Sequence, residues 1–315
     1  MAAKTDISFI IVNWNTKDLV LQCIDSLISK KGNYSQEIIV VDNASIDGSS
    51  DAIKEKYPEV QLIQNAQNLG FAKANNIGIK KSEGAYVCLL NSDIQVLDNT
   101  VSFMIDFMNN NKNVGLSGPR ILWPDLTLQH SCMNYPNIRT QICETLSLNQ
   151  LFPHTALFSG EYMTYFDHDR LIKVDWLIGC FMLIRREVLE TVGFLDELFF
   201  IYSEETDLCK RMHEADWEIV FLPEVSAIHH NASSSSKNPV RFSAEQRLSA
   251  LKYWKKHRAL PVRVVFLMLL LFHHSTRLVM LYLIHMLNRA NRKVTGALIE
   301  KHRACMSTII KYYIN

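Results

Sequence analysis

The sequence lacks the two glycine-rich motifs with which many proteins bind nucleotides. No G-x-x-x-x-G-K-[ST] segment occurs, and the turn after the first apolar run reads NWNTKD instead of G-x-G-x-x-G. These absences argue against a P-loop protein and remove the usual pyrophosphate cradle of dinucleotide enzymes. If phosphates are bound, another group has to neutralise them, and a metal ion held by carboxylates would do so.

Paired cysteines and a secretory leader are missing as well. The seven cysteines form no C-x-x-C pair, and several lie in apolar runs such as AYVCLLN at 85–91. This usage is typical of thiols that serve as small hydrophobic side chains in a reducing compartment. The first residues, MAAKTDISFIIVNW, do not follow the charged, apolar and small-residue order of a signal peptide. We therefore expect a cytoplasmic protein.

Neither charge sign dominates the 315 residues, since 33 basic and 32 acidic side chains give a formal net charge of +1. The composition, 48% hydrophobic and 21% charged, excludes a disordered tail protein and a wholly basic nucleic-acid binder. The neutral total hides a division. Residues 1–240 carry 19 basic and 30 acidic side chains, whereas residues 241–315 carry 14 and 2, for net charges of −11 and +12. The two segments are expected to have different partners.

Apolar, β-branched runs alternate with helical spacing over the first 120 residues. Four of these runs read as strands that end in Asn or Asp: 7–13, 37–42, 60–65 and 85–91. Near-continuous apolar strands separated by helices predict an α/β fold with a mostly parallel, Rossmann-like sheet covered on both faces. In such sheets ligands bind outside the carboxyl ends of the strands. Four polar strand ends therefore indicate a site, although Asn and Asp also cap helices and turns.

Helical spacing predicts helices over 16–29, with Thr16 as the N-cap, and over 70–81 and 98–109. Residues 121–170 are less regular and predict a loop or a lid. The polar stretch NASSSSKNPV at 231–240 is typical of a hinge, and we place the domain boundary there.

Acidic and imidazole side chains form three candidate groups for catalysis or metal binding. Asp93 ends the NSD segment after the fourth strand, where one carboxylate and substrate phosphates can hold an ion such as Mg²⁺. Glu204 and Glu205 lie near Asp207, and mutual repulsion raises the pKa of at least one carboxyl, which suits a general base. An acidic first helical turn gives the same pattern. A histidine pair at 229–230 adds a candidate metal ligand.

Seven segments in order resemble the inverting family 2 glycosyltransferases of the GT-A fold, closest to their rhamnosyltransferase-like branch. They are ISFIIVNWN, IIVVDNASIDGS, NLGFAKANNIGI, LLNSD, VDWLIGCFMLIRRE, GFLDELFFIYSEETDLCKR and IHHNASS. The resemblance implies an enzyme that moves a sugar from a nucleotide diphosphate donor to an acceptor hydroxyl. It also implies a GT-A catalytic domain over 1–236, which leaves 237–315 as a helical C-terminal region.

The same resemblance implies roles for single residues. Those that match donor-binding positions are Asn13, Asp42, Asn68, Gly70, Asn75, Asn91, Ser92 and Asp93. Asp93 matches the ligand of a Mg²⁺ or Mn²⁺ ion, and His229 matches the histidine that helps to hold the ion and the diphosphate. His230 is the alternative register for that histidine.

Catalytic and acceptor-side residues follow from the resemblance too. The family usually reads Glu-Asp at the start of the acceptor-side helix, where this sequence has Glu204-Glu205. Glu205 matches the base that deprotonates the acceptor, and Glu204 is the alternative carboxylate. Trp176 and Gly179 match the segment beside the donor sugar and the acceptor. Arg211 is expected to pair with nearby acids.

The basic tail lies outside the resemblance. A basic helix over 241–258 precedes an apolar region over 264–287, which approaches the roughly 20 residues of a membrane span. Arg277 near its centre would cost about 2.5–3.5 kcal/mol there. A helical wheel places polar residues on one side: His274, Arg277, His285, Asn288 and Arg292. We expect a helix that lies on an anionic membrane surface. A membrane-spanning helix, or a buried helical hairpin at a homodimer contact, is the alternative. The aliphatic runs argue against nucleic acid as the partner of the tail.

These observations predict an inverting, metal-dependent nucleotide-sugar transferase, peripheral on the inner face of a bacterial plasma membrane. Rhamnose from dTDP-rhamnose is the donor that the resemblance implies first. A polyprenyl-diphosphate-linked glycan is the expected acceptor, because a membrane-docked transferase suggests a lipid-linked one. A UDP-hexose or UDP-N-acetylhexosamine donor is an alternative, as is a non-catalytic nucleotide-sugar-binding subunit of a glycan assembly machine.

Overall fold

The computed structural model of the protein describes residues 5–230, 238–287 and 292–314. The chain forms two compact units: unit 1 is Met1–Tyr135, Phe166–Phe200 and Glu204–Ser234, and unit 2 is Pro136–Tyr165, Ile201–Ser203 and Ser235–Asn315. Residues 231–237 of the expected hinge lie outside the described residues. Residues 136–165, which the division at 236 assigns to the catalytic region, group with the C-terminal helices.

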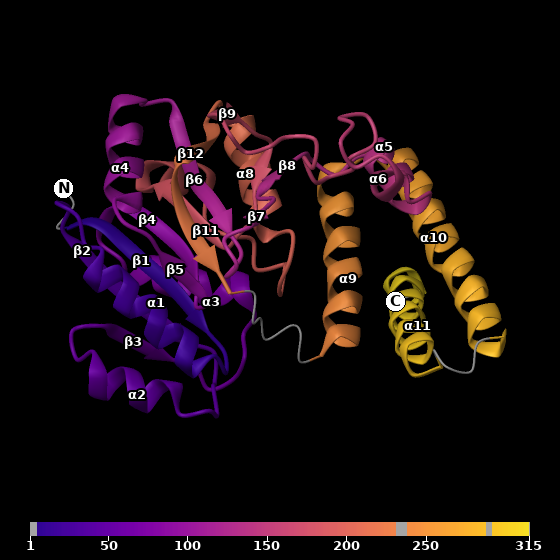
Figure 1. Ribbon diagram of the computed structural model, residues 1–315, viewed down its shortest axis with the longest axis horizontal. Helices are drawn as coiled ribbons and strands as arrows, with labels where there is room; N and C mark the ends of the chain where they lie inside the picture. The colour runs from indigo at the N-terminus through magenta and orange to yellow at the C-terminus, as the bar shows by residue number, and fades with distance from the viewer. Residues whose placement is uncertain (1–4, 231–237, 288–291, 315) are drawn as a thin grey trace. The chain divides into compact units, whose positions relative to one another are not determined.

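Unit 1 is built on one large sheet with the strand order β3-β2-β1-β4-β11-β6-β12-β5 (Figure 1). Its main strands are β1 (Thr5–Asn13), β2 (Gln36–Asp42), β3 (Gln61–Gln64), β4 (Gly84–Asn91), β5 (Ile94–Val96), β6 (Val114–Leu122), β11 (Phe181–Arg185) and β12 (Glu218–His229). The four strands predicted from apolar runs, β1 to β4, are parallel to their neighbours in this group. The other half is mixed, because β11 runs antiparallel to both β4 and β6, whereas β6 and β12 are parallel.

Short strands complete unit 1. β7 (Leu128–Gln129) pairs with β6, β9 (Ile172–Lys173) pairs with β12, and β8 (Cys132–Met133) forms a separate pair with β10 (Trp176–Leu177). Regular structure over residues 128–133 was not predicted, because these strands are only two residues long and have no periodicity of their own to read.

Helices cover both faces of the sheet, as predicted. The helices of unit 1 are α1 (Lys17–Ser29), α2 (Ser49–Lys56), α3 (Phe71–Lys81), α4 (Thr100–Asn110), α7 (Arg186–Val192) and α8 (Glu204–Glu214). On one face, α1, α2 and α4 share a buried core with the alternate β1 residues Ile7, Phe9 and Ile11. On the other, α3 lies so close to β1 that a Cβ atom at Gly78 would be 2.5 Å from Cγ2 of Ile10. The α/β class follows from this two-sided burial.

Unit 2 is helical in its described parts. It contains α5 (Ile138–Thr145), α6 (Leu148–Leu151), α9 (Pro239–His257), α10 (Leu260–Leu287) and α11 (Arg292–Ile314). α11 packs against α9 and α10, and α10 packs against α5. The basic helix expected over 241–258 is α9, and the apolar runs after it form one continuous helix, α10.

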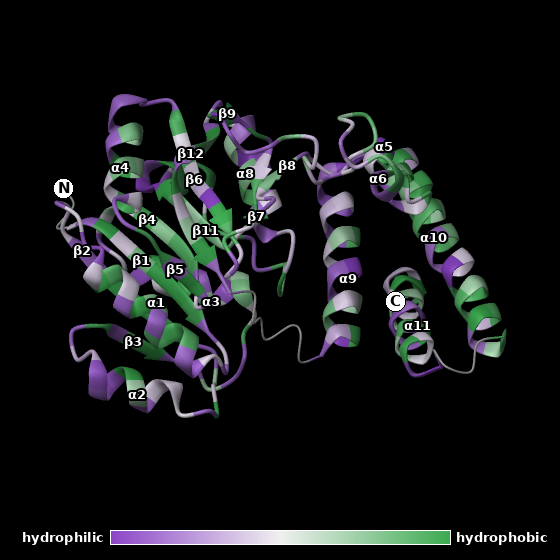
Figure 2. Cartoon of the chain, viewed as in Figure 1, coloured by the Kyte–Doolittle hydropathy of each residue, from purple (hydrophilic) through white to green (hydrophobic). Residues whose placement is uncertain are grey.

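α10 is coloured as hydrophobic over much of its length in Figure 2. Within the described ranges it is the one helix long and apolar enough, by length and composition, to cross a membrane. Its polar side faces other helices of unit 2: His285 contacts Thr295 Oγ1 of α11 at 2.8 Å, and Arg277 donates to the carbonyl oxygen of Thr145 on α5 at 3.1 Å. Asn288, assigned to that side from the sequence, lies outside the described residues. Arg292 was wrongly assigned to it, because this residue begins α11 and is exposed. The polar side of α10 itself is an internal contact of unit 2.

Candidate active site

The carboxyl ends of β1, β2 and β4 meet at one edge of the sheet because the three strands are parallel. Asn13 at the end of β1 is paired with Asp42 at the end of β2, and Asn91 ends β4 opposite Val12. Three of the polar strand ends identified in the sequence therefore converge. All of the positions considered below lie in unit 1.

A buried hydrogen-bond network joins these strand ends. Asn13 donates from Nδ2 to Asp42 Oδ1 at 2.8 Å and to Ser45 Oγ at 3.0 Å, and Asp42 Oδ2 accepts from the Ser45 amide at 3.0 Å. Thr16 occupies the N-cap position of α1, as predicted, but its hydroxyl does not cap the helix. It donates to Asn13 Oδ1 at 2.7 Å and lies 2.8 Å from Ser92 Oγ. Thr16 therefore ties the end of β1 to the segment after β4.

Asn68, Gly70 and Asn75, which match positions that bind the sugar donor, lie at and before the first turns of α3. The start of this helix packs against the segment that ends at Phe200. Asn68 Oδ1 accepts from the Gly70 amide at 2.9 Å, and the Phe71 amide donates to the Phe200 carbonyl at 2.6 Å. Gly70 has a φ of +86°, and a Cβ atom there would lie 2.4 Å from the Phe200 oxygen. Asn75 donates to the Phe71 carbonyl at 3.0 Å, while its buried Oδ1 has no hydrogen-bond partner within the described part of the chain.

Asp93 and His229 come together because β5 pairs with β12, which places Ile94 opposite His229. Asp93 Oδ1 is 3.2 Å from His229 Nε2, and both side chains are buried. His230 contributes its backbone, since its amide donates to the Asp93 carbonyl at 2.9 Å. Of the two histidines weighed from the sequence, His229 is the one whose ring contacts the Asp93 carboxylate.

Gln129 on β7 orients that imidazole and was not identified from the sequence. Its Oε1 lies 3.0 Å from His229 Nδ1 and can accept the Nδ1 proton. In the neutral ring this leaves the Nε2 lone pair directed at the Asp93 carboxylate. Two acceptors 3.2 Å apart are stable only with a proton or a cation between them. Gln129 lies in the segment that seemed irregular in the sequence, so no motif marked it.

Glu204 and Glu205 begin α8. Glu204 is buried, and this burial together with the charge of Glu205 raises the pKa of its carboxyl well above the usual range. Glu205 borders Gly179, because a Cβ atom at Gly179 would lie 3.6 Å from Glu205 Oε1. Burial, Asp93 and Glu205 in turn raise the pKa of the Cys180 thiol. The Asn91 amide donates to the Cys180 carbonyl at 3.0 Å, so residues 179–180 lie beside both the NSD segment and Glu205.

Two neighbouring groups have structural partners. Arg211 donates to Asp207 Oδ2 at 2.9 Å and to the Phe194 carbonyl at 2.7 Å, which confirms that it pairs with a nearby acid. Trp176 is buried and donates from Nε1 to the Asn134 carbonyl at 3.0 Å. Asp207 is thereby paired with Arg211.

Asn76 was also missed, although it lies in the NLGFAKANN segment. Its Nδ2 donates to the Leu195 carbonyl at 2.8 Å and to Glu197 Oε1 at 3.1 Å, and its Oδ1 accepts from the Leu195 amide at 3.1 Å. This pairing fixes the loop that leads into α8. No local pattern predicts the contact between Asn76 and Leu195, because the two residues are 119 positions apart.

Comparison with known proteins shows the family to which the chain belongs. Residues 8–193 match the model of the family described as Glycosyl transferase family 2. A curated relative from Mycobacterium tuberculosis (strain CDC 1551 / Oshkosh), N-acetylglucosaminyl-diphospho-decaprenol L-rhamnosyltransferase, is 27% identical over 227 residues. That alignment covers 67% of this chain and 72% of the relative.

Solved structures share the fold at low identity. The mannosyltransferase PcManGT from Pyrobaculum calidifontis, in complex with GDP-Man and Mn²⁺, is 14% identical with a TM-score of 0.56, over 98% of this chain and 87% of that one. GalNAc-T7 with UDP, GalNAc and Mn²⁺ is 14% identical with a TM-score of 0.57, over 78% of this chain and 47% of that one. These neighbours confirm the GT-A fold. The family match covers more than half of the residues, and the chain belongs to glycosyl transferase family 2.

Proposed function

We propose that this glycosyltransferase binds a nucleotide-diphospho-sugar at the ends of β1, β2 and β4 and transfers the sugar with inversion, using Glu205 as the base. The observation that carries the proposal is the convergence of two groups on one site. The NSD segment, whose Asn91 amide donates to the Cys180 carbonyl at 3.0 Å, and the carboxylate of Glu205, which borders Gly179, both lie beside residues 179–180. A direct displacement requires a group that stabilises the leaving diphosphate and a base that deprotonates the acceptor hydroxyl.

The residues present fit a divalent cation beside the donor phosphates. Asp93 offers a buried carboxylate, and His229 offers a ring nitrogen whose direction is set by Gln129. Mg²⁺ and Mn²⁺ accept such a set when substrate phosphates complete the coordination. A bound ion would supply positive charge against the diphosphate that leaves. The two solved neighbours described above contain Mn²⁺, which supports an ion of this class.

On the donor side, the chain's own residues bind the nucleotide sugar and orient it. Asp42, held by Asn13 and by the Ser45 amide, presents a fixed carboxylate at the end of β2, where we place the nucleoside. Asn91 and Ser92 lie between that point and Asp93. Ser92 is anchored by Thr16, so that the NSD segment is fixed to the sheet before any donor arrives. Such prior ordering lowers the entropy lost when the substrate binds.

On the acceptor side, Glu205 takes the proton of the acceptor hydroxyl as its oxygen forms a bond to the anomeric carbon. The bond from that carbon to the diphosphate oxygen breaks on the opposite side, and the configuration inverts. Gly179 lacks a side chain where it borders Glu205, which leaves room for the acceptor. Burial and the charge of Glu205 raise the pKa of Glu204, which disfavours the ionised form of Glu204. We therefore assign the base to Glu205 rather than to Glu204.

We further propose dTDP-rhamnose as the donor and a polyprenyl-diphosphate-linked glycan as the acceptor. Support comes from the name of the mycobacterial relative, an L-rhamnosyltransferase acting on N-acetylglucosaminyl-diphospho-decaprenol. UDP-linked hexose or N-acetylhexosamine donors remain the alternative. A lipid-linked acceptor also agrees with the apolar surface of unit 2.

That surface is one side of α10, which we propose lies in the interface of the cytoplasmic leaflet. Exposed apolar residues recur along it with helical spacing: Val265, Met268, Phe272, Val279, Leu283 and Met286. The polar side of the same helix is occupied by contacts within unit 2. The excess of basic residues over 241–315 would attract anionic lipids, at about 1 kcal/mol per basic residue near the surface. We thus place the protein at the inner face of the membrane.

Thermal stability with nucleotide sugars tests donor binding. The midpoint of unfolding should rise with the concentration of the correct donor in the presence of Mn²⁺, because ligand binding to the native state stabilises it. The variant Asp93→Ala should lose the part of this rise that depends on Mn²⁺. Release of nucleoside diphosphate by the wild type then separates an enzyme from a non-catalytic sugar-nucleotide-binding subunit, which would bind the donor and release nothing.

A further inference from the structure

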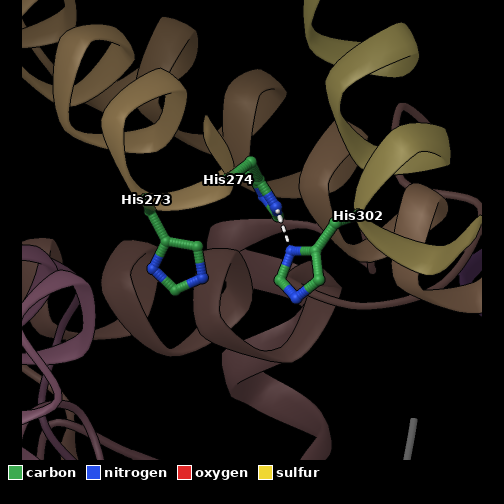
Figure 3. A group of neighbouring side chains, drawn as sticks. All are labelled: His273, His274 and His302. Atoms are coloured by element: carbon green, nitrogen blue, oxygen red, sulfur yellow. Dashed lines mark hydrogen bonds between the residues drawn. The ribbon is translucent and has the colours of Figure 1, made fainter. Parts of the chain in front are cut away.

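Three histidine rings from two helices gather in unit 2, whereas every residue of the proposed active site belongs to unit 1. His273 and His274 are neighbours on α10, and His302 lies on α11 (Figure 3). His273 is 6% exposed and His274 2%, while His302 is half-buried. One ring nitrogen of each residue lies within 4.8 Å of the other two.

The hydrogen bonding inside the cluster is incomplete. His274 Nδ1 and His302 Nδ1 are 2.9 Å apart, so one of these rings donates to the other. His274 Nε2 and His273 Nδ1 are buried and have no hydrogen-bond partner among the residues that the structure describes. A buried polar atom left without a partner costs about 1–3 kcal/mol. Two such atoms in one cluster indicate that another group satisfies them.

Two guanidinium groups are near the cluster. Burial and Arg247 lower the pKa of both His273 and His274 to about 3, and Arg277 adds to the shift of His273. The two guanidinium groups are themselves engaged. Arg247 donates to Glu144 Oε1 at 2.9 Å, and Arg277 donates to the Thr145 carbonyl at 3.1 Å and to Ser147 Oγ at 3.0 Å.

We propose that His273, His274 and His302 form a binding site for Zn²⁺ or a similar transition-metal ion. Three imidazoles suit Zn²⁺, whereas Mg²⁺ and Mn²⁺ prefer oxygen ligands, so this site is chemically distinct from the one at Asp93. With Zn–N bonds of about 2.0–2.1 Å, tetrahedral ligand nitrogens lie about 3.3 Å apart. The observed separations, from 2.9 Å up to 4.8 Å, bracket that value. Small ring rotations would close the site and leave a fourth position for water.

The consequence is a link between α10 and α11. Since α10 carries the exposed apolar side and is joined to α11 by packing and by the His285–Thr295 contact, a shared ion would strengthen the link between the two helices. Metal binding of this kind adds its free energy to that of the folded state. The full-length protein should therefore unfold at a higher temperature with Zn²⁺ than after treatment with a chelator.

Equilibrium dialysis of the full-length, chelator-treated protein against Zn²⁺ tests the site, with visible absorption of the Co²⁺ form as a second readout. The wild type should bind one Zn²⁺ per chain, and Asp93→Ala and His154→Ala should bind it as well. His154 is an exposed histidine of the same unit and serves as the matched control. His302→Ala should weaken binding at least 100-fold and abolish the absorption of tetrahedral Co²⁺.

Three outcomes would overturn the proposal: no Zn²⁺ bound by the wild type, equal binding by His302→Ala, or loss of the bound Zn²⁺ in Asp93→Ala. The last result would locate the ion at the donor site. If His302→Ala does not fold, His302→Asn replaces it, because the amide fills similar space and is a poor zinc ligand. Failure of this site leaves the proposed sugar transfer untouched, since the transfer depends on Asp93 and Glu205.

Discussion

Single residues at the strand ends have partners that restrict what they can do. His229 contacts Gln129 through Nδ1 and Asp93 through Nε2, so its tautomer and its direction are both set by neighbours. Glu204 is buried, and this burial together with the charge of Glu205 raises the pKa of its carboxyl. The proposed roles of His229 as a metal ligand and of Glu205 as the base rest on these surroundings.

Gln129→Ala should weaken Mn²⁺ binding by about 10–100-fold, the usual effect of removing a partner that orients a metal-binding histidine. Without the Oε1 acceptor, His229 can turn and protonate at Nε2. Titration of Mn²⁺ against the purified protein, followed by electron paramagnetic resonance, measures the affinity. Gln61→Ala, at an exposed glutamine of β3, is the control. Unchanged affinity in Gln129→Ala would show that His229 is not held in this way.

Glu204→Gln should change how stability depends on pH. The raised pKa means that native Glu204 stays protonated where the unfolded chain, with a pKa near 4.3, has lost its proton. The wild type therefore loses stability as pH rises through the interval from about 4.3 to the native pKa, by at most about 1.4 kcal/mol per pH unit from this group. Urea denaturation at a series of pH values should show that the free energy of unfolding of the variant increases relative to that of the wild type over this interval. Parallel curves would contradict the assignment.

At the scale of elements, the start of α3 and the loop ending at Phe200 depend on each other. Gly70 has a φ of +86° and contacts the Phe200 carbonyl, and Asn76 of the same helix holds Leu195. The loop between these contacts leads directly to α8 and its two glutamates. α3 therefore helps to position the loop that leads to Glu204 and Glu205, although the helix and the loop are far apart in the sequence.

Gly70→Ala should destabilise the protein by about 1–3 kcal/mol from backbone strain alone, with a further loss from the clash with Phe200. Thermal unfolding measures the effect. Gly48→Ala is the matched control, because Gly48 also has a positive φ, +78°, but its nearest neighbour would be Lys17 Nζ at 3.7 Å. Equal losses in the two variants would show that contact with the loop contributes nothing.

The sequence predicted the elements that have their own periodicity and failed where structure depends on distant partners. The apolar runs predicted β1 to β4, and the polar ends of β1, β2 and β4 converge as expected. The contact between Asp93 and His229 required the pairing of β5 with β12, which no local pattern contains. Gln129 and Asn76 were missed for the same reason. Thr16 was placed correctly, but its hydroxyl bonds Asn13 and Ser92, partners that helix-capping rules do not consider.

At the scale of the whole molecule, the proposed active site and the proposed membrane-binding surface belong to different units. The proposed site residues are all in unit 1, and the exposed apolar side of α10 is in unit 2. The net charge of +1 conceals this division, because the acidic and basic parts nearly cancel. Each function can therefore be removed separately.

Replacing Met268, Phe272 and Leu283 by serine should release the protein from vesicles that contain anionic lipid. The three side chains are exposed, so their loss should leave the fold intact while it removes most of the apolar contact with lipid. Co-sedimentation with the vesicles measures binding. A control variant replaces Ile46, Phe103 and Leu126, which are exposed in unit 1, with serine. If the first variant sediments as the wild type does, α10 is not the membrane-binding surface.

The rate of nucleoside diphosphate release by Glu205→Gln, measured beside its affinity for the donor, tests the central claim most directly. The assay combines dTDP-rhamnose or a UDP-sugar, Mn²⁺ and a polyprenyl-diphosphate-linked N-acetylglucosamine acceptor. Because the amide cannot take the acceptor's proton, we predict that the rate falls by about 10²–10⁴-fold while the donor is bound as in the wild type. A rate equal to that of the wild type would contradict the assignment of Glu205 as the base.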